Sequence, residues 1–489
     1  MLYKKEWLKA LIPIIIGFIV FFIPQPESLS INAWIFTSIF AALIMALILE
    51  PAPPAFLGII GVVIAVLFKV GPVGSGAINN ATSAAQAIKW GLSGFSNTVV
   101  WLIFVAFMIG LGYKTSGFGH RLALFLVKKM GRTTLGLGYA ISITDVILAP
   151  FIPSNAARSG GILYPMVTSI PPMFGSYPDK DAKKIGAYLA WTAYAATCVS
   201  SSIFLTGQAP NPLAVELAVK AGIPMVGWGG WFVAFLPVAI ILFLLTPLLT
   251  YWIYPPEIKD CKKISAWIDE EYSKLGPMNK KEIAMMLISI LALILWIGSK
   301  FFGIHPTTTA LTILMLMLMF RVITWDEMLG NRPAWNVLLW FATLITMASG
   351  LKNVGFLAWL ASEAGSYFQG LSPTWAVLGL LILFCVLRYF FASGTAYTTA
   401  MVALFATLLQ HIPGVNPSEA MLILLLPMGL MGVLAPYATG HSPVWFASHY
   451  VKSSDFWRLG AIFGLIFLVI FILIDIPYIH YIYPYLSHF

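Results

Sequence analysis

The residues most suited to binding a ligand lie in the segment 151–161, between two apolar stretches. It contains three small residues in succession, Ser154-Asn155-Ala156, and Arg158 follows the serine by about one helical turn. Short hydroxyl and amide groups donate hydrogen bonds to carboxylate oxygens. A helix that begins here adds free N–H groups and the positive end of its dipole, which also favour an anion. These residue types and their spacing predict a binding site for negative charge.

A second segment, 391–400, has the same character. It contains Ser393-Gly394-Thr395 and then Tyr397, and Ser393 comes 239 positions after Ser154. Each segment lies between two long apolar arms, and such a break is tolerated at membrane depth only inside protein or beside a watery cavity. Two of them in corresponding parts of a chain indicate the binding site of a secondary transporter. We therefore predict two re-entrant helical hairpins, at 134–169 and 373–411.

Two further apolar stretches contain helix breaks at small residues. Thr206-Gly207 interrupts the stretch 184–221, and Thr439-Gly440-His441 interrupts the stretch 419–450. A proline follows each break and prevents an early restart of the helix. Four half-helix ends are therefore expected to converge, which suits a small molecule with negative charge at both ends. The alternative is that these are packing kinks, because Gly and Ser are common at helix contacts in membranes.

Three basic residues near these breaks allow a functional or a structural interpretation. A charge such as Arg158 costs about 2.5–3.5 kcal/mol or more inside a bilayer, which makes it a candidate for substrate binding. In that role it would cross the membrane uncompensated without substrate, and so hold the empty carrier on one side. The alternative is an ion pair with Asp145. We interpret Arg388 as structural or interfacial, and His441 either as a substrate or titrating group or as a satisfied hydrogen-bonding residue.

Composition excludes an ordinary soluble protein. Of the 489 residues, 60% are hydrophobic and 10% are charged, whereas about a quarter are charged in soluble domains. The apolar runs predict an all-α polytopic membrane protein with about 11 transmembrane helices in addition to the two hairpins. The net charge of +9 lies mostly in loops, so nucleic acid is not a predicted partner. Three scattered cysteines favour neither a disulfide framework nor a metal site, and no metal, cofactor or catalytic residue is predicted.

The two halves of the chain form an inverted repeat. Besides the tips, Asn97 and Trp101 correspond in order and spacing to Asn336 and Trp340. With the N-terminus in the cytoplasm, nearly all lysines and arginines fall on the cytoplasmic side, as the positive-inside rule requires. We therefore predict a multi-pass protein of the cell inner (plasma) membrane, with the N-terminus cytoplasmic, the C-terminus outside and the hairpins entering from opposite faces.

The paired tips and the Thr-Gly breaks, in this order, resemble the divalent anion–sodium symporter family, which includes dicarboxylate and citrate carriers. The family's Ser-Asn-Thr appears here as Ser154-Asn155-Ala156 and as Ser393-Gly394-Thr395, each departing at one position. The resemblance implies a homodimer with a fixed scaffold and a transport domain that moves as an elevator. The implied parts are scaffold helices in 1–133 and 282–372, a cytoplasmic linker at 255–281, and transport-domain parts at 134–254 and 373–489.

Two residues favour the exchanger branch of this family, which includes bacterial citrate or tartrate–succinate antiporters and plastid 2-oxoglutarate–malate carriers. Sodium-coupled members hold the cation just behind each tip, where this chain has Arg158 and Tyr397. We predict the exchange of small di- or tricarboxylate anions, with succinate, malate, fumarate, 2-oxoglutarate, citrate and tartrate as candidates. The alternative is a sodium-coupled dicarboxylate symporter.

An integral-membrane enzyme is a third interpretation. It is disfavoured because the sequence has no His-Glu-x-x-His pair and no Ser or Cys beside a plausible His–Asp base. The predicted site is therefore a substrate-binding site formed by the tips, the breaks and their neighbours. Its residues are Ser154, Asn155, Ala156, Arg158, Thr206, Gly207, Ser393, Gly394, Thr395, Tyr397, Thr439, Gly440 and His441.

Overall fold

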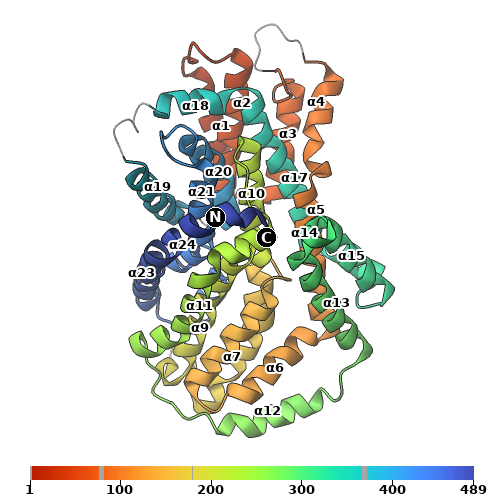
Figure 1. The fold of residues 1–489 in the computed structure, drawn as a ribbon, viewed down its shortest axis with the longest axis vertical. Coiled ribbons are helices and arrows are strands. Elements are labelled where there is room, and N and C mark those ends of the chain that lie inside the picture. The colour runs from red at the N-terminus through yellow and green to blue at the C-terminus, as the bar shows by residue number, and fades with distance from the viewer. Residues whose placement is uncertain (1–2, 76–81, 179, 366–371, 392, 489) are drawn as a thin grey trace. The chain divides into compact units, whose positions relative to one another are not determined.

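The computed structural model describes residues 3–75, 82–178, 180–365, 372–391 and 393–488 (Figure 1). These residues are mostly helical, and apart from isolated bridges no strand occurs among them. This architecture suits an apolar chain, because a helix satisfies the backbone N–H and C=O groups of a membrane span within one segment. The prediction of an all-α fold is confirmed.

Six helical segments among the described residues are long and apolar enough to cross a membrane. They are α2 (Ile31–Leu49), α5 (Thr98–Ser116), α11 (Trp228–Ile253), α17 (Arg332–Asn353), the segment Pro373–Phe390 and the segment Ser453–Leu486. Shorter apolar helices, such as α3 (Pro54–Leu67) and α15 (Pro306–Met319), accompany them. The count of eleven spans and the re-entrant path of the hairpins remain predictions.

The chain divides into two compact units. The first comprises Met1–Phe104, Pro212–Met225 and Arg332–Leu425, and the second comprises Val105–Asn211, Val226–Asn331 and Leu426–Phe489. This division separates the two predicted hairpins, since the first hairpin belongs to the second unit and the second hairpin to the first. The functional division into scaffold and transport domains remains a prediction.

Small residues allow close helix packing in the first unit. Its further helices are α1 (Tyr3–Phe22), α4 (Ala84–Gly91), α18 (Phe356–Gly365), α19 (Pro373–Leu387), α20 (Gly394–Leu409) and α21 (Pro417–Leu425). Where α3 packs on α17, a Cβ added at Gly58 would lie 2.1 Å from Thr343 Oγ1. A Cβ at Gly94 would lie 1.8 Å from the carbonyl oxygen of Ala342. Glycine is therefore required at both contacts, as is common where membrane helices approach closely.

The second unit is built around α9 (Gly186–Ile203), whose residues are all buried. This helix lies beside α7 (Thr134–Leu148) and α11 (Figure 1). The other helices of the unit are α6 (Phe118–Met130), α8 (Tyr164–Ser169), α12 (Lys263–Lys274), α13 (Lys280–Ile297), α14 (Ser299–Phe302), α15, α16 (Trp325–Gly330), α22 (Ser442–Phe446), α23 (Ser453–Ile470) and α24 (Ile476–Ile482). α5 and α10 (Pro210–Ala221) have residues in both units.

Both stretches with a Thr-Gly break are interrupted where expected. After α9 the chain forms the short 3-10 turn η5 (Leu205–Gly207) before α10 begins. After α21, the turns η8 (Leu426–Met428) and η9 (Leu430–Leu434) precede a non-helical stretch that ends at α22. The breaks at Thr206-Gly207 and Thr439-Gly440 are therefore real features of the backbone.

The linker between the two halves is fastened at its end by a buried ion pair. Arg121 in α6 donates from Nε to Glu282 Oε1 at 2.7 Å, and its terminal nitrogens donate to backbone carbonyl groups of Leu275, Gly276 and Pro277. Glu282 also closes a capping box with Asn279 at the start of α13. The linker itself forms α12, whose surface pairs include Lys274–Glu270.

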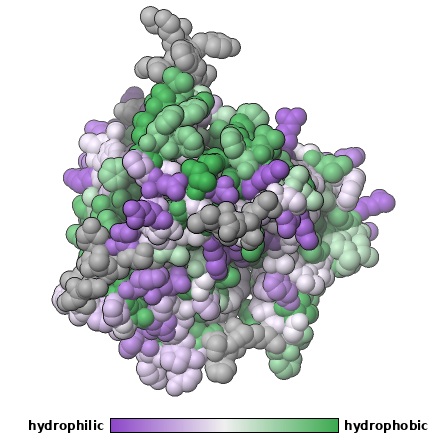
Figure 2. Space-filling view, turned by 90° about the horizontal axis from the view of Figure 1, so that it is seen from above, coloured by the Kyte–Doolittle hydropathy of each residue, from purple (hydrophilic) through white to green (hydrophobic). Residues whose placement is uncertain are grey.

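Large apolar side chains are exposed in both units, for example Phe22 and Leu67 in the first and Phe301 and Leu473 in the second. On the face drawn in Figure 2, apolar side chains gather in patches beside polar and charged ones. Exposed apolar area on this scale is unusual for a soluble monomer and typical of a surface that contacts lipid.

Candidate functional site

The tip of the first hairpin is a short extended segment between two helices. After α7 ends at Leu148, Pro150 and Pro153 prevent the helix from continuing. The second arm starts as a π-helix, η2 (Ala156–Leu163). The Ser154 hydroxyl accepts a hydrogen bond from the Ala157 N–H at 3.2 Å, so the serine caps this arm as a helix N-cap does. Short π-helical turns of this kind are frequent at functional sites.

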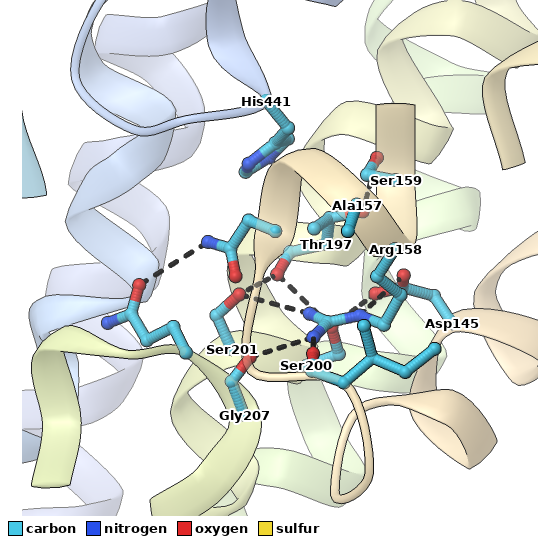
Figure 3. A network of polar contacts seen from close by, with 12 residues as sticks. Asp145, Ala157, Arg158, Ser159, Thr197, Ser200, Ser201, Gly207 and His441 are labelled. Carbon is cyan, nitrogen blue, oxygen red and sulfur yellow. Dashed lines mark hydrogen bonds and ion pairs between the residues drawn. The ribbon is translucent and has the colours of Figure 1, made fainter. Parts of the chain in front are cut away.

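The Arg158 side chain is fully buried behind this tip (Figure 3). A guanidinium group has five N–H donors, and each has an acceptor here. The acceptors are Asp145 Oδ1 at 2.9 Å, the carbonyl oxygens of Ile152 at 2.7 Å and Gly207 at 2.8 Å, and the hydroxyls of Ser200 at 3.0 Å and Ser201 at 3.2 Å. The Ser200 hydroxyl in turn donates to Asp145 Oδ2. The guanidinium has no donor left for a substrate in this conformation.

Arg158 forms an ion pair with Asp145, which is the alternative that the sequence left open. This ion pair also bears on the expectation that the arginine would cross the membrane uncompensated when no substrate is bound. Both side chains are 0% exposed and 2.9 Å apart, so Asp145 offsets the positive charge inside the same unit. That expectation is therefore wrong for the conformation described. An uncompensated Arg158 cannot be the barrier that holds the empty carrier on one side.

Asn155 connects three segments that are far apart in the sequence. Its Nδ2 donates to Thr439 Oγ1 at 3.1 Å and to Gln208 Oε1 at 3.4 Å. Asn155 is 7% exposed, and its Oδ1 atom has no hydrogen-bond partner among the described residues. The first tip and both Thr-Gly breaks therefore meet at one asparagine. A free acceptor is left at their junction.

Gln208 is a site residue that the sequence interpretation missed. Its Oε1 accepts from Asn155, and its Nε2 donates to Asn211 Oδ1 at 2.7 Å. Its position could have indicated this role, because Gln208 lies in the break between Gly207 and Pro210, outside the helices.

The Thr206-Gly207 break is held by contacts inside the second unit. Thr206 Oγ1 donates to the carbonyl oxygen of Pro150 at 2.7 Å and accepts from Trp228 Nε1 at 3.1 Å. The Gly207 carbonyl oxygen accepts from Arg158, and a Cβ at Gly207 would lie 2.9 Å from the carbonyl oxygens of Ser200 and Ser201. Thr206 and Gly207 position the break, and neither hydroxyl nor carbonyl is free in this conformation.

The second break presents Gly440 to the surface and keeps His441 inside. Gly440 is exposed, and a Cβ there would lie 3.5 Å from Ala156 Cβ, so the break adjoins the first tip. His441 is fully buried, with Nε2 3.3 Å from the Tyr194 carbonyl oxygen and 3.7 Å from Cys198 Sγ. A carbonyl oxygen only accepts, so this contact assigns the proton of a neutral imidazole to Nε2. Nδ1 is then an acceptor, and it has no partner among the described residues.

The tip of the second hairpin lies in the first unit. Ser393 Oγ accepts from the Ala396 N–H at 3.4 Å, and Ser393, Gly394 and Thr395 are half-buried. Tyr397 is 2% exposed, and its hydroxyl donates to the Phe384 carbonyl oxygen. Ser154, Asn155, Ala156, Thr439, Gly440 and His441 are brought together in the second unit, and whether the second tip faces them remains a prediction.

Arg388 takes part in the second tip as a structural group. Its guanidinium donates to the Ser393 carbonyl oxygen at 3.2 Å and lies over the Tyr397 ring, 5.1 Å from the centroid. Both contacts fix the tip from inside the hairpin. They agree with the structural interpretation of Arg388.

Comparison with known proteins identifies the family. Residues 4–483 match the model of the sodium:sulfate symporter transmembrane region. The L-tartrate/succinate antiporter of Escherichia coli (strain K12) is 41% identical over 475 residues, which is 96% of this chain and 97% of that protein. The protein of the same name from Shigella flexneri has the same identity and coverage. The chain therefore belongs to the sodium:sulfate symporter family, and the resemblance inferred from the tips is confirmed.

A solved structure supports the fold independently of close sequence similarity. The crystal structure of the Alcanivorax borkumensis YdaH transporter superposes with a TM-score of 0.58 at 13% identity, covering 88% of this chain and 99% of that chain. Together with the family match, this fold defines a helical, multi-pass membrane transporter of small anions. Among the described residues no cluster of His, Cys, Asp or Glu could hold a metal ion.

Proposed function

We propose that the protein exchanges one dicarboxylate for another across the cell membrane, without sodium coupling. The observation that carries this proposal is the arginine network behind the first tip. Arg158 fills the place where sodium-coupled relatives are expected to hold their cation, and its five donors are all satisfied by the protein. A guanidinium stays charged at any working pH and, unlike a sodium ion, cannot dissociate. Relatives named L-tartrate/succinate antiporters, 41% identical over 96% of the chain, support exchange.

Substrate carboxylates would be bound at the tips. In this proposal Ser154, Ser393 and Thr395 donate to carboxylate oxygens, together with the N–H groups that begin the second arms. Asn155 adds a donor when its Nδ2 exchanges the 3.4 Å bond to Gln208 for a carboxylate oxygen. Thr439 and Gly440 complete the site beside the first tip. Arg158 and Tyr397 act from behind the tips and hold them in place.

Two hydrogen-bond acceptors without a partner among the described residues favour a substrate that carries a hydroxyl group. Asn155 Oδ1 and His441 Nδ1 are buried and have no partner among the described residues. A carboxylate has no proton to donate to them, whereas a substrate hydroxyl has one. Tartrate and malate carry such hydroxyls and succinate does not, so we expect the hydroxylated acids to bind more tightly. Fumarate and 2-oxoglutarate have no hydroxyl group and are weaker candidates on this argument, whereas citrate carries one.

The transport cycle in this proposal is of the elevator kind. A homodimeric scaffold would stay fixed while the part containing the tips carries the substrate across, with the N-terminus in the cytoplasm and the C-terminus outside. In this orientation nearly all lysines and arginines would fall on the cytoplasmic side, as the positive-inside rule requires.

The test is uptake of labelled succinate or tartrate into proteoliposomes. Vesicles preloaded with unlabelled dicarboxylate should take up label equally in sodium and potassium buffers, and vesicles without internal substrate should take up little. Protein-free liposomes are the control. Uptake into empty vesicles driven by an inward sodium gradient would instead establish the alternative function, a sodium-coupled symporter.

A further inference from the structure

Asp475 is a buried acidic residue that the proposed exchange does not use. It ends η10 (Phe471–Asp475), a π-helix between α23 and α24. The side chain is 0% exposed, and neither carboxyl oxygen has a hydrogen-bond partner among the described residues. Nearly all buried polar groups have a partner. A carboxyl group without one indicates a ligand that the protein chain itself does not supply.

The backbone around Asp475 is unusual on both sides of the contact. η10 packs against α11, where the backbone amide of Val238 lies beside the carboxyl group without completing a hydrogen bond. Pro237 precedes this amide, and Pro477 follows Asp475 by two residues, so each helix lacks an N–H group close to the contact. Single π-turns inside helices are frequent at functional sites. The unpartnered acid and the irregular backbone are independent observations at one place.

The surroundings determine which ligand fits. The contact between η10 and α11 is otherwise apolar, as in the ring contact of Phe235 with Phe471. A metal ion needs several oxygen or nitrogen ligands, and no group of acidic, His or Cys side chains among the described residues supplies them. A lone carboxylate in apolar surroundings costs far more than the neutral acid. The ligand that one carboxyl group can hold here is a proton.

We propose that Asp475 is a proton-binding site: it is protonated while the carrier works at neutral pH, and its ionisation at alkaline pH stops exchange. Among the described residues, no basic side chain forms a hydrogen bond with this carboxyl group. Tyr478 in α24 is the titratable group that interacts with it, and the others are Tyr251 at the far end of α11, the paired Asp455 and Arg458 at the far end of α23, and His480 and Tyr481 later in α24.

Helix α11, which packs against η10, also positions the candidate site. α11 begins with Trp228, whose Nε1 donates to Thr206 Oγ1 at 3.1 Å, and Trp231 Nε1 donates to the Ser202 carbonyl oxygen at 2.9 Å. Both acceptors lie at the break between α9 and α10. A charge appearing between η10 and α11 would therefore disturb the helix that positions this break. This links ionisation to transport within the second unit.

Infrared spectroscopy of the full-length protein in proteoliposomes tests the proton directly. The carbonyl stretch of a neutral carboxylic acid is expected at neutral pH in the wild type, absent in Asp475→Asn and retained in Asp269→Asn, whose acid is exposed. This measurement needs no substrate, so it can fail or succeed independently of the proposed exchange. A missing band in the wild type, or an unchanged band in Asp475→Asn, would overturn the proposal.

Exchange of labelled succinate supplies the functional half of the test. Wild-type exchange should fall about tenfold for each pH unit above the midpoint of ionisation, as for a single titrating group. Asp475→Asn, which imitates the neutral acid, should keep the neutral-pH rate and lose this decline. If the variant does not fold, the wild-type infrared band and the wild-type exchange rate must disappear together as the pH is raised. Parallel pH profiles in both proteins, or a band that persists where exchange is lost, would refute the link to transport.

Discussion

The two hairpins are cross-linked at corresponding positions by different chemistry. In the first, the residue four places after the tip serine, Arg158, bonds to Asp145, nine places before it. In the second, the residue four places after Ser393 is Tyr397, whose hydroxyl donates to the backbone of Phe384, again nine places before the serine. Both serines also accept a hydrogen bond from the N–H three residues later.

The comparison separates a geometric part of the hairpin design from an electrostatic part. Each hairpin has a bond between its two arms at this depth, which ties the arms together behind the tip. The first hairpin makes that bond with opposite charges, and later segments contribute further acceptors to it, at Ser200, Ser201 and Gly207. The charged link therefore organises its surroundings, whereas the tyrosine link is local.

Stability should fall most when one partner of the charged link is removed. Arg158→Ala leaves Asp145 buried and unpaired, and breaking such a pair costs about 3–5 kcal/mol. We expect a strongly lowered unfolding temperature in detergent, measured in sodium-free buffer. The double variant Arg158→Met with Asp145→Leu should recover much of this loss, because it removes both charges. Equal unfolding temperatures for Arg158→Ala and the wild type would show that the pair does not stabilise the hairpin.

A smaller effect is expected at the tip itself. Asn155→Ala removes a donor to a charged substrate, which costs about 1–3 kcal/mol, or roughly 5- to 150-fold in affinity. Binding of dicarboxylate to the purified protein, followed by calorimetry, measures the change. Thr439→Ala is the matched control, because it removes the Asn155–Thr439 bond and keeps the asparagine. Equal losses in the two variants would mean that Asn155 serves only to join the segments.

The tyrosine link should matter less than the charged one. Tyr397→Phe removes a neutral hydrogen bond to a backbone carbonyl group, worth about 0.5–1.5 kcal/mol. The unfolding temperature should fall slightly and exchange should persist. A decrease in unfolding temperature as large as that of Arg158→Ala would show that the two links stabilise their hairpins equally.

The smallest effect is expected for an exposed ion pair, which serves as a reference for the buried one. In α12 the hydrogen bond from Lys274 lowers the pKa of the Glu270 carboxyl group. Because the pKa is lower in the folded protein, the pair's contribution is present above the unfolded pKa and is lost as the pH falls through the folded value. Both side chains are largely exposed to solvent, so we expect Glu270→Gln to leave the unfolding temperature unchanged at neutral pH. A clear decrease would contradict this expectation.

The sequence predicted the parts of the site that depend on local signals. The two serine tips, the Thr-Gly breaks and the family follow from small residues within apolar stretches, and these features occupy the predicted positions. The role of Arg158 could not be settled, because three of its five acceptors belong to a later helix and the break that follows it. Gly207, for example, is 49 residues away. The Asn155–Thr439 bond joins residues 284 positions apart, and no periodicity encodes such a contact.

The arrangement around Arg158 has a consequence for what the protein would become without it. One carboxylate, two hydroxyls and two backbone carbonyl oxygens converge on a single side chain. Oxygen atoms of these kinds are the ligands that hard cations prefer. Shortening the arginine to alanine therefore leaves a vacant coordination cage, and sodium, unlike choline, should restore part of the thermal stability that Arg158→Ala loses. An equal response to both salts would mean that the oxygens collapse once the guanidinium is gone.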